Sequence, residues 1–132
     1  MDLSNLIPTD DSIVVTVKHP LTEEPLLKDD GKEMTITLYA PHSAQYKGVV
    51  HEQTNKRIQK ASKGKKITFT AEEIEAATLD LLAKTTKDWN IQLNGKSPKF
   101  SASEAVDLYG KLPWLKQQLM EAQEDYSAFL KS

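Results

Sequence analysis

The sequence predicts an α+β fold that is predominantly helical, and three patterns lead to this expectation. Two short segments near the N-terminus, 13–17 and 34–39, are rich in β-branched residues, which is typical of strands. Apolar side chains then recur at helical spacing in four later segments. Two Thr/Ser-x-x-Glu capping boxes and one Asn-Gly pair mark where helices begin and where a hairpin turns.

Length and composition favour one domain spanning residues 1–132. We expect residues 1–11 to form a loosely ordered lead-in, residues 12–40 a β unit and residues 41–132 a helical part. The absence of cysteine excludes disulfides and thiolate metal ligands. No apolar run approaches the ~20 residues that span a bilayer, and the N-terminus lacks the features of a signal peptide. We therefore expect a soluble cytosolic protein.

The β unit is predicted to be a two-stranded antiparallel pair. The first strand, 13–17, ends before His19-Pro20, and a long polar loop follows it. Residues 34–39 alternate apolar residues with threonine, which places Met34, Ile36 and Leu38 on one face of a half-buried strand.

Two longer amphipathic helices are expected next. The first covers about residues 43–62 and has a thin apolar stripe, made by Tyr46, Val49, Val50, Arg57, Ile58 and Ala61. The second starts at the capping box of Thr70 and Glu73 and ends near Lys87. Its stripe consists of Ile74, Ala77, Thr78, Leu81 and Leu82.

A small hairpin and two further helices complete the prediction. Trp89, Ile91 and Leu93 alternate with polar residues, and Asn94-Gly95 is the preferred type I′ turn. Ser101 and Glu104 form a second capping box, whose short helix is expected to end at Gly110 as a left-handed cap. That helix should turn Ala105, Val106, Leu108 and Tyr109 inward. Pro113 suits the first turn of the last helix, whose stripe is Leu115, Leu119, Ala122, Tyr126, Phe129 and Leu130.

No residue pattern predicts catalysis, a metal site or a cofactor. The three histidines, His19, His42 and His51, form neither H-x-x-H nor H-E-x-x-H. Gly64-Lys65-Lys66 lacks the remainder of a phosphate-binding loop. We therefore expect a protein that is not an enzyme and binds no metal.

A basic run is the sharpest electrostatic feature of a chain whose net charge is −2. It contains no acidic residue and consists of Lys56, Arg57, Lys60, Lys63, Lys65 and Lys66. These cations suit a solvated helix end, where they complement the helix dipole, and they would also suit docking of an acidic partner. Nucleic acid is the less favoured reading, since no aromatic residue for base stacking lies between Tyr46 and Phe69.

The two tryptophans have different expected environments. Trp89, at the start of a strand, is expected in the core. Trp114, near Phe129 and Leu130 at the C-terminus, fits either the core or an exposed aromatic face that binds a partner.

Several short patterns, taken together and in order, resemble one protein family. They are Met34 to Tyr39 with Pro41, His42, Ser43 and Tyr46; Thr70 and Glu73; Trp89 to Leu93 with Asn94-Gly95; Phe100-Ser101 with Ala105, Leu108 and Tyr109; Pro113, Trp114, Leu115 and Gln118; and Phe129-Leu130. In this combination, which covers essentially the whole chain, the sequence resembles the tail assembly chaperones of bacteriophages and prophages with long, non-contractile tails.

The resemblance implies a non-enzymatic role in tail morphogenesis. Such chaperones act in the host cytoplasm, bind the tape measure protein, recruit subunits of the tail tube (the major tail protein) around it, and are absent from the mature virion. Many are also made in a second form, extended by a ribosomal frameshift. On this view the last helix offers an apolar groove to the tape measure, through Trp114, Leu115, Leu119, Tyr126 and Phe129. Self-association is a further expectation, and no membrane contact is expected.

Two other classes of function stay open. The chain could be a structural tail or head-tail connector protein that is retained in the virion. It could also be a small nucleic-acid-binding regulator that uses the basic run.

Overall fold

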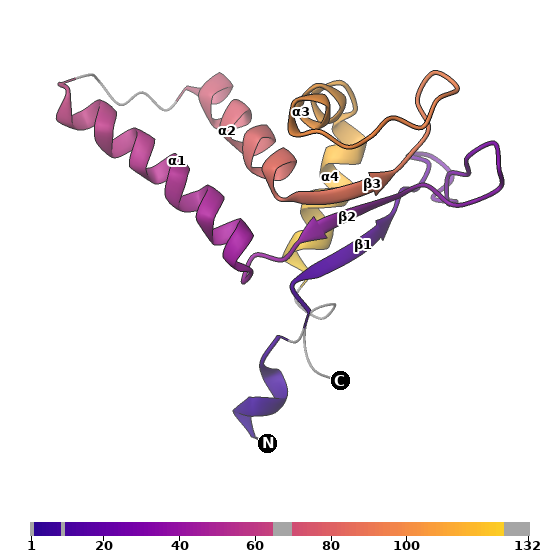
Figure 1. Ribbon diagram of the computed structural model, residues 1–132, viewed down its shortest axis with the longest axis horizontal. Coiled ribbons are helices and arrows are strands. Elements are labelled where there is room, and N and C mark those ends of the chain that lie inside the picture. The colour runs from indigo at the N-terminus through magenta and orange to yellow at the C-terminus, as the bar shows by residue number, and fades with distance from the viewer. Residues whose placement is uncertain (1, 9, 65–69, 126–132) are drawn as a thin grey trace.

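The computed structural model describes residues 2–8, 10–64 and 70–125, which form an α+β fold around a three-stranded sheet (Figure 1). The α+β class predicted from the sequence is thereby confirmed. In chain order the elements are a 3-10 helix η1 (Leu3–Leu6), strands β1 (Ser12–Thr16) and β2 (Thr35–Tyr39), helices α1 (Ala44–Ser62) and α2 (Ala71–Lys84), strand β3 (Thr86–Asn90), and helices α3 (Ala102–Lys111) and α4 (Pro113–Glu124).

The sheet has the order β1-β2-β3, and both neighbouring pairs are antiparallel. Ile13 lies opposite Leu38, and Ile36 lies opposite Trp89. The register between β2 and β3 shifts between Thr37 and Leu38. The predicted pairing of the first two strands is correct, and the alternation in β2 does place Ile36 and Leu38 in the core, both fully buried.

The third strand differs from the prediction in its start and in its partner. It begins at Thr86, inside the segment predicted to end the second helix, and it pairs with β2. The sheet therefore takes a strand from the part of the chain predicted to be helical, and α2 ends at Lys84 and not near Lys87. Asn94 and Gly95 form the predicted turn, with φ of 54° and 74°, but the returning segment makes one bridge, Leu93 to Lys96.

The core lies between one face of the sheet and helices α3 and α4, together with the end of α2. Its buried side chains include Val17, Ile36, Leu38, Leu82, Trp89, Ile91, Leu108, Tyr109, Leu115 and Leu119. Trp89 is 8% exposed, so its predicted place in the core is correct. Its indole Nε1 donates a hydrogen bond to the Pro98 carbonyl (3.0 Å), and its ring packs edge-on against Phe100.

Three hydroxyl side chains begin the first three α-helices, as their sequence contexts predict. The oxygen atoms of Ser43, Thr70 and Ser101 each accept a hydrogen bond from the amide three residues later, at 3.2 Å in every case. Pro113 is in the first turn of α4, also as predicted.

The end of α3 was predicted incorrectly. Gly110 lies within the helix, without a positive φ, and the helix continues to Lys111. The helix ends without a left-handed residue, because the Leu112 amide donates a hydrogen bond to the Leu108 carbonyl and so continues the helical pattern to the last turn of α3. Val106, predicted to face inward, is 37% exposed.

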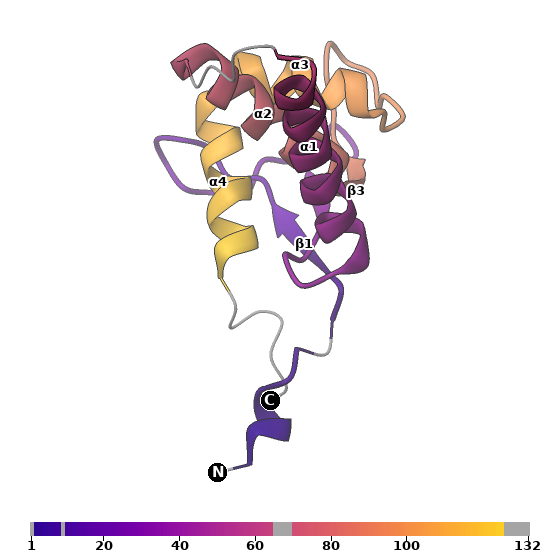
Figure 2. The ribbon, with the colours of Figure 1, turned by 90° about the vertical axis from the view of Figure 1, so that its left-hand side faces the viewer.

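Helix α1 projects from the rest of the fold in Figure 1, and in Figure 2, where that side faces the viewer, it lies in front of the other elements. It has no buried residue. Its bounds match the prediction, but its apolar stripe is mostly not covered. Tyr46 and Val49 are half-buried, whereas Ile58 is 59% exposed. We call residues 44–64 and 70–78 the arm, and residues 12–43 and 79–124 the body.

The lead-in contains η1, whose Ser4 amide donates to the Asp2 carboxylate (3.0 Å). Leu3, Leu6 and Ile7 are exposed. A search of the described helices finds none whose length and apolar character would let it cross a membrane.

Candidate partner-binding surfaces

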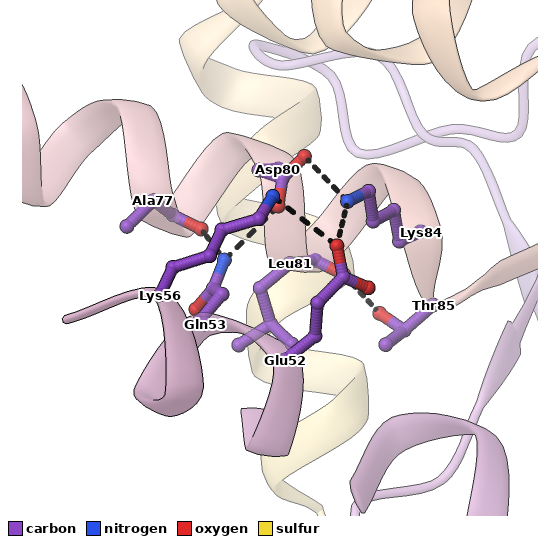
Figure 3. Close-up of polar contacts among 8 residues, drawn as sticks. All are labelled: Glu52, Gln53, Lys56, Ala77, Asp80, Leu81, Lys84 and Thr85. Carbon is purple, nitrogen blue, oxygen red and sulfur yellow. Dashed lines mark hydrogen bonds and ion pairs between the residues drawn. The ribbon is translucent and has the colours of Figure 1, made fainter. Parts of the chain in front are cut away.

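A seam of polar contacts joins helix α1 to helix α2 (Figure 3). The Lys84 ammonium bonds to the Glu52 carboxylate at 3.1 Å and lies 3.5 Å from Asp80. Lys56 forms a second ion pair with Glu52, at 3.2 Å. Gln53 donates from Nε2 to the Ala77 carbonyl (2.9 Å) and to Asp80 (3.1 Å).

This seam stabilises the angle between α1 and α2 only weakly. The hydrogen bond from Lys84, then that from Lys56, lowers the pKa of Glu52, and the hydrogen bond to Glu52 raises the pKa of Lys84. Both side chains are substantially exposed, so solvent and salt screen their attraction. The arm therefore depends on polar contacts where the body depends on buried apolar area.

The arm exposes a row of apolar side chains. Val50 and Ile58 flank Thr54 at spacings of four residues, so they lie along one side of α1, and they are 36% and 59% exposed. Ile74 on α2 is 52% exposed, although its helical neighbours Thr78 and Leu81 are half-buried. Helices α1 and α2 diverge as they extend away from the sheet (Figure 1). Ile74, near the outer end of α2, is therefore less covered than Leu81, which lies nearer the sheet.

The basic run occupies the second half of α1, next to this apolar row. Lys56, Arg57, Lys60 and Lys63 are all exposed. Within the described part of the chain, no carboxylate forms an ion pair with Lys60 or Lys63. Lys65 and Lys66, predicted to belong to the same cluster, lie outside the described residues. The arm thus combines exposed apolar side chains with positive charge.

The partner-binding face predicted on the last helix, α4, is largely buried in the structure. Leu115 and Leu119 are 3% and 0% exposed, since α4 packs them against the sheet and α3, so they cannot form an open surface in this structure. Trp114 is half-buried at the edge of the core. Tyr126 and Phe129 lie outside the described residues. Of the predicted set, Trp114 is the described member that reaches the surface.

Trp114 lines an open groove of about 920 Å³ between β1 and α4. Ile13 and Val15 contribute from the strand, and Ala122 contributes from the helix. Across one end of the groove, the Gln118 side chain bonds to the main chain of Lys18. Its Nε2 donates to the Lys18 carbonyl (2.8 Å), and its Oε1 accepts from the Lys18 amide (3.1 Å).

In the part of the chain that the structure describes, no three His, Cys, Asp or Glu side chains lie close enough to hold a metal ion. His42 Nε2 lies 3.8 Å from the Asp11 carboxylate, while the His19 ring accepts hydrogen bonds from nearby loop amides. Burial raises the pKa of Tyr109 to about 12, and its hydroxyl bonds to Thr86 (2.9 Å), so it serves the core.

Sequence reasoning missed the groove and the exposed position of Ile74. Both depend on how elements distant in sequence lie together, which periodicity does not report. A weak indication of the exposure of α1 existed, because its apolar stripe is too thin for a helix that is covered on one side.

Comparison of the chain with protein-family models, curated proteins and solved structures finds no match to any of them.

Proposed function

We propose that this protein is a non-enzymatic tail assembly chaperone, which binds a tape measure protein and recruits tail tube subunits during tail morphogenesis. The ordered residue patterns described above support the family assignment. The arm supports the mode of action, because it offers an apolar and basic helix surface that the body does not need for its own stability.

The observation that carries this proposal is the exposure of α1. A helix of 19 residues with no buried side chain contributes little to folding, yet it is well formed and capped at Ser43. Such a helix, together with Ile74 of α2, can complete a groove for an amphipathic client helix. A tape measure is a long helical protein, and covering its apolar stripe would prevent aggregation.

The basic side chains of the arm define the charge of the client segment. Lys60 and Lys63 would pair with acidic residues that flank the apolar stripe of the bound helix. Exposed pairs of this kind add on-rate and orientation more than affinity. Among the described residues predicted to form a site on α4, Trp114 is the one placed to contact a client, since Leu115 and Leu119 are buried in the core.

Co-expression with the large helical protein of the same genome, followed by affinity purification, tests the proposal. The wild-type chain should co-purify with that protein, and the double variant Ile58→Asp/Ile74→Asp should not. Val106→Asp is a matched control, because Val106 is a partly exposed apolar residue on a helix of the body. Circular dichroism should be unchanged for all variants. Co-purification that survives the double variant would exclude the arm as the client surface.

Localisation to the host cytoplasm is part of the same proposal. Mass spectrometry of purified particles should detect the tail tube protein and not this chain. Its presence in the particle would instead favour a structural tail or head-tail connector protein.

The exposed basic side chains favour one alternative, a small nucleic-acid-binding regulator. That function predicts a DNA mobility shift that weakens steeply with salt and is lost when Lys56, Lys60 and Lys63 are changed to Gln. A chaperone should show neither effect.

A further inference from the structure

Strand β1 lies at the edge of the sheet, and among the described residues no other segment pairs with its outer side along Ser12, Val14 and Thr16. The Val17 amide bonds to Met34, and the Asp11 carbonyl bonds to Ala40, so the odd-numbered residues direct their main-chain groups toward the β2 side. Main-chain groups alternate along an antiparallel strand. The even-numbered residues therefore direct theirs outward, as the contact of Lys18 with Gln118 confirms.

The outer side of β1 lacks the sequence features that usually prevent an edge strand from pairing with a strand of another molecule. Its sequence, Ser-Ile-Val-Val-Thr, contains no proline, glycine or charged residue. The opposite edge strand, β3, has exposed charges at Lys87 and Asp88, and its pairing with β2 is interrupted by a register shift. Natural proteins use such charges and irregularities to block edge-to-edge contact. The two edges of this sheet thus differ in their readiness to accept another strand.

We propose that β1 pairs antiparallel with β1 of a second copy of this chain, about a two-fold axis at Val14. In this register Val14 faces its own copy, Ser12 faces Thr16, and Ile13 faces Val15. Each outward-directed residue then meets another outward-directed residue, so the main-chain groups can bond in both directions. The strand is self-complementary in side chains as well, because hydroxyls pair with hydroxyls and aliphatic groups with aliphatic groups.

The groove beside Trp114 gives the side chains of the second copy a place to pack. Ile13 and Val15 are half-buried on the helix-covered face of the sheet. The same two residues of the second copy would project on that face, because the strands share one sheet. They would enter the open groove between β1 and α4, where Trp114 and Ala122 provide apolar surface.

Charges outside the strand match in the same register. Asp10 lies two residues before β1, and Lys18 lies two residues after it. Continuing the register outward places Asp10 of each copy opposite Lys18 of the other. The described structure gives neither side chain an ion-pair partner within its own chain. Gln118 holds the main chain of Lys18, so backbone pairing should end at Thr16 while the two charges still approach.

Cysteine cross-linking tests the register directly, since the natural chain has no cysteine. A Val14→Cys variant should be converted to a covalent dimer by a short bis-maleimide, because paired Cα atoms in this register are about 5.5 Å apart. Thr16→Cys should react far less, since its two copies would be about 14 Å apart along the strands. Val106→Cys, on α3, controls for random collision.

Sedimentation equilibrium on the full chain, at concentrations up to about 1 mM, tests the association itself. The wild type should show a monomer–dimer equilibrium. Val14→Lys should be monomeric with an unchanged circular dichroism spectrum, because Val14 is 61% exposed and its change opposes two like charges across the axis. Asp10→Lys should weaken the dimer at least several-fold, and the double variant Asp10→Lys/Lys18→Asp should restore it.

Three results would overturn the proposal. One is a wild-type chain that stays monomeric over the whole concentration range. Another is a dimer that persists in Val14→Lys, which would place self-association on a different surface. The third is equal cross-linking of Val14→Cys and Val106→Cys.

Discussion

The body and the arm of this molecule are both well-formed, yet different forces hold them. Among the described residues, every buried side chain lies in the body. The arm has none. Its contacts with the body include half-buried residues near Ser43 and the polar contacts of Glu52 and Gln53 with Asp80 and Lys84. Buried apolar area stabilises by about 25 cal/mol per Å², whereas exposed ion pairs contribute little.

This difference separates folding from the proposed client binding within one small chain. Substitutions of buried residues in the body should change the free energy of unfolding, and substitutions in the arm should mainly change the proposed contacts with a client. The predictions that follow test how complete this separation is, in order of decreasing effect.

Leu119→Ala should produce the largest loss of stability, about 2–5 kcal/mol, because Leu119 is fully buried and its truncation leaves a cavity. Urea titration followed by circular dichroism measures this loss. The matched arm variant, Ile58→Ala, should change stability by less than about 0.5 kcal/mol. Equal losses in the two variants would show that the arm is packed more closely than its exposure indicates.

Tyr109→Phe should cost about 1 kcal/mol, because it removes the hydrogen bond to Thr86 while keeping the ring. Thr86 retains its bond to the Leu82 carbonyl, so no buried donor is left without a partner.

The same variant should change the response of stability to alkaline pH. The pKa of Tyr109 is about 12 in the folded chain, above its ordinary value of 10.0. The unfolded chain therefore loses this proton first, and wild-type stability should fall as pH rises from about 10 to about 12. Tyr109→Phe should show a shallower fall in denaturant titrations across this range. Identical slopes would mean that the hydroxyl is accessible to solvent.

Gly110→Ala should stabilise the body by about 0.5 kcal/mol, because Gly110 is helical and alanine restricts the unfolded chain. A methyl group there would meet the Leu79 side chain at 3.7 Å, an ordinary contact. The midpoint of thermal unfolding measures the gain. A decrease would indicate that α3 and α2 are too closely packed for one more carbon atom.

Glu52→Gln should leave cooperative unfolding nearly unchanged and affect the arm alone. Hydrogen exchange should become faster in α1, since the ion pairs with Lys84 and Lys56 are lost. The wild type should lose the same protection as pH falls through the lowered pKa of Glu52, because a protonated carboxyl no longer pairs with lysine. Faster exchange throughout the body would contradict the separation proposed here.

Local signals made much of this fold predictable from sequence. The caps at Thr70 and Ser101 depend on a side chain and an amide three residues away, so neighbouring residues suffice to identify them. The alternation of β2 reports directly that one side of the strand is buried. The turn at Asn94 and Gly95 needs a positive φ at two successive residues, and few residue pairs other than Asn-Gly adopt it readily.

Predictions failed where distant parts of the chain decide the outcome. Thr86, Lys87 and Asp88 show no apolar alternation, and pairing with β2 makes them a strand. In the sequence, Leu115 and Leu119 are equally compatible with a place in the core and with a partner-binding surface. They are buried because α4 packs over the sheet, which the sequence pattern does not report. The open edge of β1 follows from strand order, which no local pattern specifies. The predicted chaperone role and its partners stay a prediction.

The single buried hydroxyl at the base of α1 has a mechanical consequence. Ser43 is 2% exposed, donates to the Ala40 carbonyl (2.7 Å) and caps the helix, so it fixes one end of a rigid rod. The rod is about 28 Å long, given 19 residues at about 1.5 Å each. A tilt of about 10° at this pivot would move the far end by about 5 Å, and α1 itself carries no buried side chain. Under the proposed function, such a tilt would let the arm adjust its position to a bound client helix.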